Sequence, residues 1–248
     1  MLNGGKRGRS GVAAVEAALI MPVLIILMLS AYDLIAAAGA WRNTRAAATA
    51  TAEISTYLAV NSNGTNQLTS TQVQNAATAV YAYLPNLFSM SSSQFTVTLS
   101  AVVFAPTANC NSNACVCVTN GATSNTSVVG SSKTPVASGG STQCYIANTA
   151  WSAPLSYGTQ QSRPCGQLLP ATSTTPTPTT IPVGVYGPYS VMVADIRYTY
   201  TPIFLGYIMG TITFNETAYV PPRIGGSGVS NYVQYSPSTA TAVCKGYV

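Results

Sequence analysis

An uncharged run from Ala17 to Tyr32 follows a short basic segment and constrains everything after it. A helix from Val12 to Trp41 would be about 45 Å long at 1.5 Å per residue, and its apolar part could cross a hydrocarbon core of about 30 Å. Lys6, Arg7 and Arg9 precede the run. Because basic residues favour the cytoplasmic side of a membrane, the sequence predicts a single-pass topology with a cytoplasmic N terminus and the C-terminal bulk outside.

An ordinary cleavable secretory signal is the competing interpretation, because small residues at Ala36 to Ala38 follow the apolar run. Glu16 disfavours it, since an acid at membrane depth costs about 2.5 to 3.5 kcal/mol and needs a partner. Helix-compatible spacing also continues from Trp41 to Leu58, where a signal peptide normally ends in extended structure. We therefore expect a retained helix that runs to about Val60, before the turn residues 61–64.

Composition argues against nucleic-acid binding and catalysis. Charged residues make up 6% of the chain, and the basic residues beyond the N-terminal segment are scattered singly, not gathered in a stripe that could neutralise phosphates. Histidine, the commonest general base, is absent. We expect Asp33 to lie at the outer membrane interface and Asp195 to pair with Arg197 in a strand. We expect no enzyme, no cofactor and no nucleic-acid partner.

All the cysteines lie downstream of the apolar run, among turn-forming residues. They are Cys110, Cys115, Cys117, Cys144, Cys165 and Cys244. An even number outside the cytoplasm favours disulfides in an oxidising compartment. A zinc site at the first three is the alternative, but histidine is absent and the spacing lacks a second C-x-x-C pair, so we expect no metal. The sequence does not choose among the many disulfide pairings that six cysteines allow.

The exported part, residues 61–248, combines helix and strand patterns. Thr69 or Ser70 can cap a second helix, which ends before Pro85 and whose apolar stripe is expected to pack on a sheet. Alternation of apolar and polar residues from Phe95 to Ala101 is the clearest strand pattern.

Two further strands are expected at Tyr189–Tyr200 and Thr211–Val220, as antiparallel neighbours. Residues 106–188 are rich in Gly, Ser, Asn and Pro and are interpreted as a cysteine-rich loop insertion. The sequence therefore predicts an α+β fold, in which a long N-terminal transmembrane helix precedes a second helix packed on a small antiparallel sheet.

The N-terminal string KRGRSGVAAVEAALIMP, from Lys6 to Pro22, resembles the start of TadE-like proteins of the tight-adherence (Flp) pilus system, relatives of type IV pilins. Near the C terminus, YTYTPIF at 198–204 and AYVPPR at 218–223 resemble the closing part of such chains. The resemblance covers both ends and leaves out the cysteine-rich middle. It implies a pilin-like fold.

In that family a membrane aspartyl prepilin peptidase cuts after a glycine, and a glutamate stands fifth in the mature chain. The resemblance therefore implies a leader over residues 1–11, a cut between Gly11 and Val12, and a transmembrane and extended helix over 12–60. In pilins the mature glutamate is thought to pair with the free N-terminal amine of a neighbouring subunit. Glu16 is then the expected assembly contact, and the pairing would satisfy an otherwise costly buried carboxylate.

The leading hypothesis is a minor pilin-like (pseudopilin) subunit that acts in assembly or priming of a tight-adherence pilus. A major pilin of this system is expected to be much shorter. The expected partners are prepilin peptidase, other pilin-like subunits, the inner-membrane assembly platform and membrane lipid, with the exported domain in the periplasm of a bacterium or incorporated in the pilus. The alternative hypothesis is a membrane-anchored or secreted surface-binding protein outside any pilus, whose insertion binds a ligand in adhesion.

Overall fold

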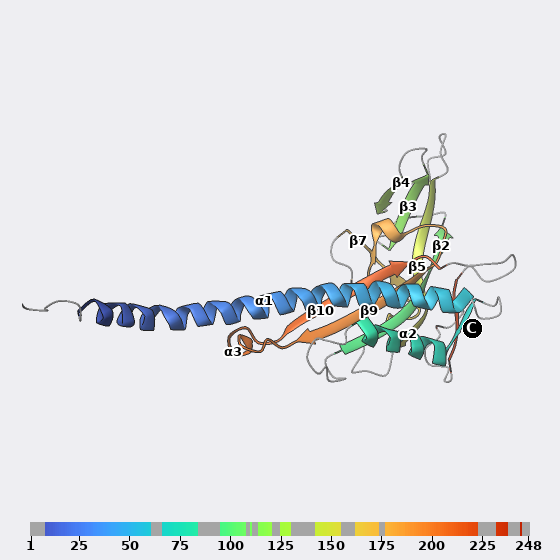
Figure 1. Ribbon diagram of the computed structural model, residues 1–248. Helices are drawn as coiled ribbons and strands as arrows, with labels where there is room; N and C mark the ends of the chain where they lie inside the picture. Colours follow the sequence, from blue (N-terminus) through green and yellow to red (C-terminus); the bar gives the residue numbers. More distant parts are fainter. Residues whose placement is uncertain are drawn as a thin grey trace, which may run out of the picture.

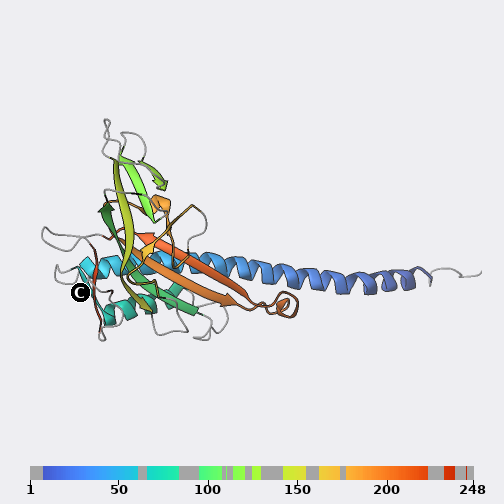
Figure 2. The same ribbon diagram turned by 180° about the vertical axis from the view of Figure 1, so that it is seen from behind.

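A long helix and a strand-rich body make up the molecule, shown from opposite sides in Figures 1 and 2. The computed structural model describes residues 8–60, 66–83, 95–107, 110, 114–120, 125–129, 142–154, 162–173, 177–222, 232–237 and 244. The fold is α+β with an N-terminal helix, as the sequence predicts.

Helix α1 (Gly8–Val60) is 53 residues long, which corresponds to about 80 Å. Its N-terminal half projects from the body, and its C-terminal half lies along the sheet (Figure 1). Pro22 lies inside the helix. Its ring removes one backbone hydrogen bond in the projecting half. The two halves of one continuous helix therefore have different surroundings.

Small residues line the face of α1 that packs on the body. Ala40, Ala47 and Ala52 are fully buried. Thr44 and Thr51 are also fully buried, and each hydroxyl donates a hydrogen bond of 2.8 Å to the carbonyl four residues earlier. A buried hydroxyl is thereby satisfied within the helix. Because these side chains are short, the helix axis can approach the sheet closely.

The main sheet of the described residues has seven strands in the order β10-β9-β2-β5-β3-β4, with β6 paired to β5. Every pairing in this sheet is antiparallel. The strands are β2 (Phe95–Thr107), β3 (Cys115–Asn120), β4 (Asn125–Val129), β5 (Thr142–Pro154), β6 (Leu168–Leu169), β9 (Val191–Tyr200) and β10 (Ile212–Val220). The three strands expected from the sequence are confirmed as β2, β9 and β10, and the last two are antiparallel neighbours.

The expected loop insertion over 106–188 is corrected, because this segment contributes β5 to the middle of the sheet. Trp151 of β5 is fully buried; its indole N–H donates to the carbonyl of Val233 at 2.6 Å, and its ring lies 4.9 Å from that of Tyr235. The hydroxyls of Ser100 and Ser152 are hydrogen-bonded at 2.9 Å between β2 and β5. The cysteine-rich segment is therefore part of the folded body.

Helix α2 (Ser70–Tyr83) begins with a reciprocal cap. The amide of Thr69 donates to the side chain of Gln72 at 2.8 Å, and the amide of Gln72 donates to the Thr69 hydroxyl at 3.3 Å. This arrangement satisfies two amides that the first helical turn leaves unpaired. The expected cap at Thr69 is confirmed.

Helix α2 meets the expected packing on the sheet only in part, through Val73, which shares a buried cluster with Phe95 and Val97 of the main sheet. Its main contacts are with α1 and with β1 (Gln67–Thr69), and Val73 and Ala76 are its buried residues among the side chains described. Strand β1 pairs in parallel with β11 (Gln234–Ser236) in a sheet of two. Because α1 covers β9 and β10, α2 lies beside α1 and reaches the buried cluster of the sheet through Val73.

Short elements complete the body. The parallel pair β7 (Ala171–Thr172) and β8 (Ile181–Pro182) is followed by the 3-10 turn η1 (Val183–Val185). Helix α3 (Gly206–Met209) lies in the connection between β9 and β10. Both views place α3 beside α1, on the side of the body from which the helix projects (Figures 1 and 2).

Candidate functional site on the projecting helix

The predicted processing bond, between Gly11 and Val12, lies in the first turns of α1. A peptidase that takes its substrate in extended form must unwind these turns before cutting. Glycine costs about 1 kcal/mol relative to alanine inside a helix, and serine is also a weaker helix former. Gly8, Ser10 and Gly11 therefore make this end of the helix easy to unwind. The cut itself stays a prediction.

Glu16 is exposed on the projecting half of α1. It is the one charged residue of the segment 14–32, and its neighbours Val15, Leu19 and Ile20 are also exposed. A carboxylate on a lipid-facing helix surface is costly unless a cation or a hydrogen-bond donor from another molecule meets it. The placement of Glu16 therefore suits a contact between chains, which remains a prediction.

Apart from Glu16, the projecting half exposes apolar side chains on every side, and its apolar part is about as long as a hydrocarbon core is thick. Large apolar side chains are exposed throughout Val15–Met28, a pattern typical of helices surrounded by lipid. From Ala14 to Tyr32 the helix measures about 28 Å, close to the thickness of a hydrocarbon core of about 30 Å. The helix is long and apolar enough to be a candidate single membrane span.

Asp33 is the first fully buried side chain after this apolar run. Its carboxylate accepts three backbone hydrogen bonds from the start of the α3 turn: from Ile203 at 3.1 Å, Phe204 at 2.9 Å and Leu205 at 2.7 Å. Beside it, the rings of Tyr32 and Phe204 meet edge to face with centroids 6.0 Å apart. Sequence reasoning placed Asp33 at the membrane interface but missed this partner, which lies about 170 residues away.

A second polar contact joins α1 to the same pair of strands. The indole N–H of Trp41 donates to the Glu216 carboxylate of β10 at 2.6 Å. Trp41 lies eight residues after Asp33, about 12 Å further along the helix. Because the two contacts lie at different positions along the helix axis, they fix both the position and the direction of α1 relative to the β9–β10 pair. The projecting half therefore leaves the body at a defined angle.

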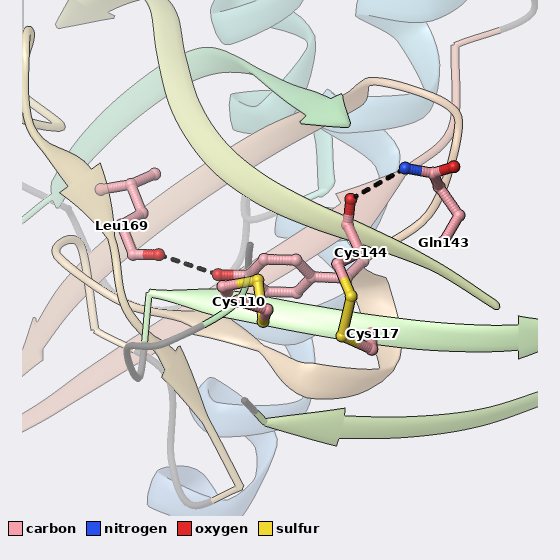
Figure 3. The surroundings of a disulfide bond; sticks show 7 residues. Cys110, Cys117, Gln143, Cys144 and Leu169 are labelled. Carbon is pink, nitrogen blue, oxygen red and sulfur yellow. Dashed lines mark hydrogen bonds between the residues drawn. A yellow bond between two sulfur atoms is a disulfide. The ribbon is translucent and has the colours of Figure 1, made fainter. Parts of the chain in front are cut away.

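The cysteines form three disulfides in the structure: Cys110–Cys115, Cys117–Cys144 and Cys165–Cys244. The Cys117–Cys144 bond joins directly opposed residues of β3 and β5, with Cys110 close by (Figure 3). The sulfur atoms of the first two pairs all lie within 4.8 Å of one another, and all four cysteines are buried. Four cysteines so close could hold a zinc ion as thiolates if they were reduced, whereas an oxidising compartment would favour the disulfides present here.

The expected ion pair between Asp195 and Arg197 is corrected. Asp195 instead pairs with the buried Arg163 through two hydrogen bonds of 2.9 Å. The same guanidinium donates to the carbonyls of Pro178 and Thr180 at 3.2 and 3.4 Å. This network ties the segment before β9 to the sheet. Arg163 is almost fully buried, and its contacts hold this segment against the sheet, which is a structural role.

Tyr219 lies beside this network, and it packs against the buried cluster that contains Tyr186. Burial raises the pKa of Tyr219 to about 12, an effect that the nearby Arg163 guanidinium partly opposes. Burial also raises the pKa of Tyr186, whose hydroxyl donates to the carbonyl of Leu169 at 2.8 Å. Both phenols are therefore neutral at physiological pH. Tyr186 acts as a hydrogen-bond donor within the core, and the Tyr219 ring packs 5.9 Å from the Arg163 guanidinium.

Comparison with known proteins finds no match to any family model, curated protein or solved structure. The class of protein is therefore described from the fold and the N-terminal helix alone. The chain is an α+β protein with a disulfide-bonded, strand-rich body and one N-terminal helix that is a candidate membrane span.

Proposed function

We propose that this protein is a minor pilin-like subunit that acts in assembly or priming of a tight-adherence pilus in the inner membrane of a bacterium. Prepilin peptidase removes residues 1–11, α1 crosses the membrane, and the body faces the periplasm. The observation that carries the proposal is the projecting half of α1: apolar all round, one bilayer long, and bearing a single acid at Glu16 close to Val12.

An apolar surface all round the helix suits two successive environments. Before assembly, lipid surrounds the side chains of the projecting half. In a fibre, the same side chains pack against the helices of neighbouring subunits, and no polar stripe has to be buried on the way. A helix that remained an anchor would need only the first environment. The second requires a partner for Glu16.

Cleavage supplies that partner. An intact chain carries a peptide bond between Gly11 and Val12, whereas the cut chain begins with the free amine of Val12. A carboxylate and an ammonium group that are both in low dielectric attract strongly, and each removes the cost of burying the other. The Glu16 carboxylate of one subunit would then select the Val12 amine of its neighbour, so only processed subunits would join.

The size of the body favours a minor role over a major one. The family resemblance implies that major pilins of this system are much shorter chains. The disulfide-bonded body would occupy a large space beside each helix, which suits a subunit that is incorporated once, at the start or at the base of a fibre. The partners would be other pilin-like subunits and the assembly platform.

Complementation of a deletion strain tests the proposal. Loss of this chain should abolish tight-adherence pili on the cell surface, counted by electron microscopy. Wild type and Glu53→Ala, an exposed acid of the same helix, should restore them, whereas Glu16→Ala should insert into the membrane but restore few or none. Normal piliation in the deletion strain would contradict the proposed function, and normal piliation with Glu16→Ala would remove the assembly contact.

A further inference from the structure

The connection between β9 and β10 carries a cluster of exposed apolar side chains, which we term the hairpin tip and define as residues 203–209. The exposed fractions are 52% for Ile203, 47% for Phe204, 101% for Tyr207, 79% for Ile208 and 49% for Met209. The whole segment 198–211 contains no charged residue. A folded protein gains nothing in water from presenting such a cluster, so the tip is suited to a partner.

The structure fixes the height of this tip along α1. Asp33 holds the backbone of residues 203–205, and Phe204 contacts Tyr32. These two helix residues mark the end of the apolar run. The tip therefore lies beside the point where the candidate span would leave the hydrocarbon core on the outer side. Both views show α3 in this position, next to the helix (Figures 1 and 2).

The chemistry of the tip matches the interfacial zone of a bilayer. Tyrosine is enriched at the level of the headgroups, and apolar side chains beside it can enter the boundary between headgroups and acyl chains. The Asp33 carboxylate would oppose such an approach if it were bare. Three backbone N–H donors cover it instead, so the nearest acid is already solvated by the protein.

We propose that the hairpin tip inserts into the outer leaflet of the same bilayer that α1 crosses. The inference rests on the proposed membrane insertion of α1. The body would then be held against the membrane at two points, the helix and the tip, with Asp33 as the joint between them. Continuity with the apolar helix favours lipid over a second copy of the chain, because the tip lies at the end of the apolar run, on the side of the body from which the helix projects.

Fluorescence quenching tests the proposal on the full chain in vesicles made from phosphatidylcholine brominated in its acyl chains. Three single variants place a tryptophan at exposed positions: Ile25→Trp in the projecting half, Tyr207→Trp in the tip, and Tyr57→Trp far along α1 as the control. The signal of the parent chain, from Trp41 and Trp151, is subtracted. Tyr207 is fully exposed, so its replacement does not disturb packing.

The account predicts strong quenching for Ile25→Trp, quenching of at least half that extent for Tyr207→Trp, and little for Tyr57→Trp. If Ile25→Trp is quenched and Tyr207→Trp behaves like the control, the inserted tip is overturned while the membrane helix stands. A blue-shifted but unquenched Tyr207→Trp would overturn it in favour of a protein partner. An unquenched Ile25→Trp would remove both the anchor and the tip.

Discussion

The Asp33 carboxylate and the backbone N–H of Leu205 lie 2.7 Å apart, although 172 residues separate them in the chain. Asp33 marks the position where α1 leaves the body, and Leu205 belongs to the turn between the two strands beneath it. A long helix that projects from a small domain can tilt about its point of exit. The contact at Asp33 removes that freedom at the position where tilt would begin.

Removal of the Asp33 carboxylate should release the turn. Asp33→Ala leaves three N–H groups without their acceptor, so the amides of Ile203, Phe204 and Leu205 should exchange with solvent about tenfold faster or more. Asp33→Asn keeps one acceptor oxygen and should give an intermediate rate. Hydrogen–deuterium exchange with mass spectrometry of the full chain in detergent measures this.

Glu53→Gln is the matched control, because Glu53 is an exposed acid of the same helix. Exchange of residues 203–205 should be unchanged in this variant. Equal exchange in Asp33→Ala and in the wild type would mean that the turn is held by apolar packing alone. Asp33 would then not be the residue that fixes α1 to the turn.

Asp195→Asn should destabilise the body, because it leaves the charge of the buried Arg163 without its carboxylate. Breaking a buried pair on one side typically costs about 3 kcal/mol. Arg197→Ala, at an exposed position of the same strand, should change the free energy of unfolding by less than about 0.5 kcal/mol. Denaturant unfolding followed by circular dichroism compares the two, and an equal effect of both would contradict the assigned pairing.

The disulfides should differ in their contribution to stability. Cys165–Cys244 closes a loop with a sequence separation of 79, whereas Cys110–Cys115 has a separation of 5. Loop-closure entropy predicts a loss of about 4.5 kcal/mol for replacing the long-range pair by serine and about 2 kcal/mol for the short one. A thiol assay on the unfolded wild type should detect no free thiol. Bound zinc, with four reactive thiols after chelation, would refute the two clustered disulfides.

Burial of Tyr219 should make the body less stable in alkali. Its pKa is raised from the ordinary 10.0 to about 12, so the folded chain keeps a proton that the unfolded chain releases. The resulting stabilisation is fully present below pH 10 and is lost as the pH rises from about 10 to about 12. Tyr219→Phe should therefore flatten the fall of the melting temperature over this window, whereas Tyr207→Phe, fully exposed, should leave it unchanged. Identical profiles for wild type and Tyr219→Phe would contradict this.

Elements with regular patterns could be predicted from the sequence. The apolar run and its helical continuation predict α1, and the alternation that begins at Phe95 predicts β2. Both patterns reflect which surfaces of an element avoid water. Strand β5 was missed. Its residues from Cys144 to Ala153 are largely buried on both faces, so the period of two that identifies a half-exposed strand is absent.

Contacts between distant residues could not be predicted. Asp33 and Asp195 each stood out as acids in a chain with few charges, yet their partners are backbone amides about 170 residues away and Arg163 in an irregular segment. No local spacing encodes such pairs. The proposed site at Gly11, Val12 and Glu16 is the reverse case, since it is predicted from local sequence alone and its test needs molecules outside this chain.

Mass spectrometry of the mature N terminus, in cells with and without prepilin peptidase, tests whether the chain is cut after Gly11. We expect a chain that begins at Val12 when the peptidase is present and an uncut bond between Gly11 and Val12 when it is absent. A mature chain that begins near Gly39 or Trp41, or an intact leader in both strains, would contradict it.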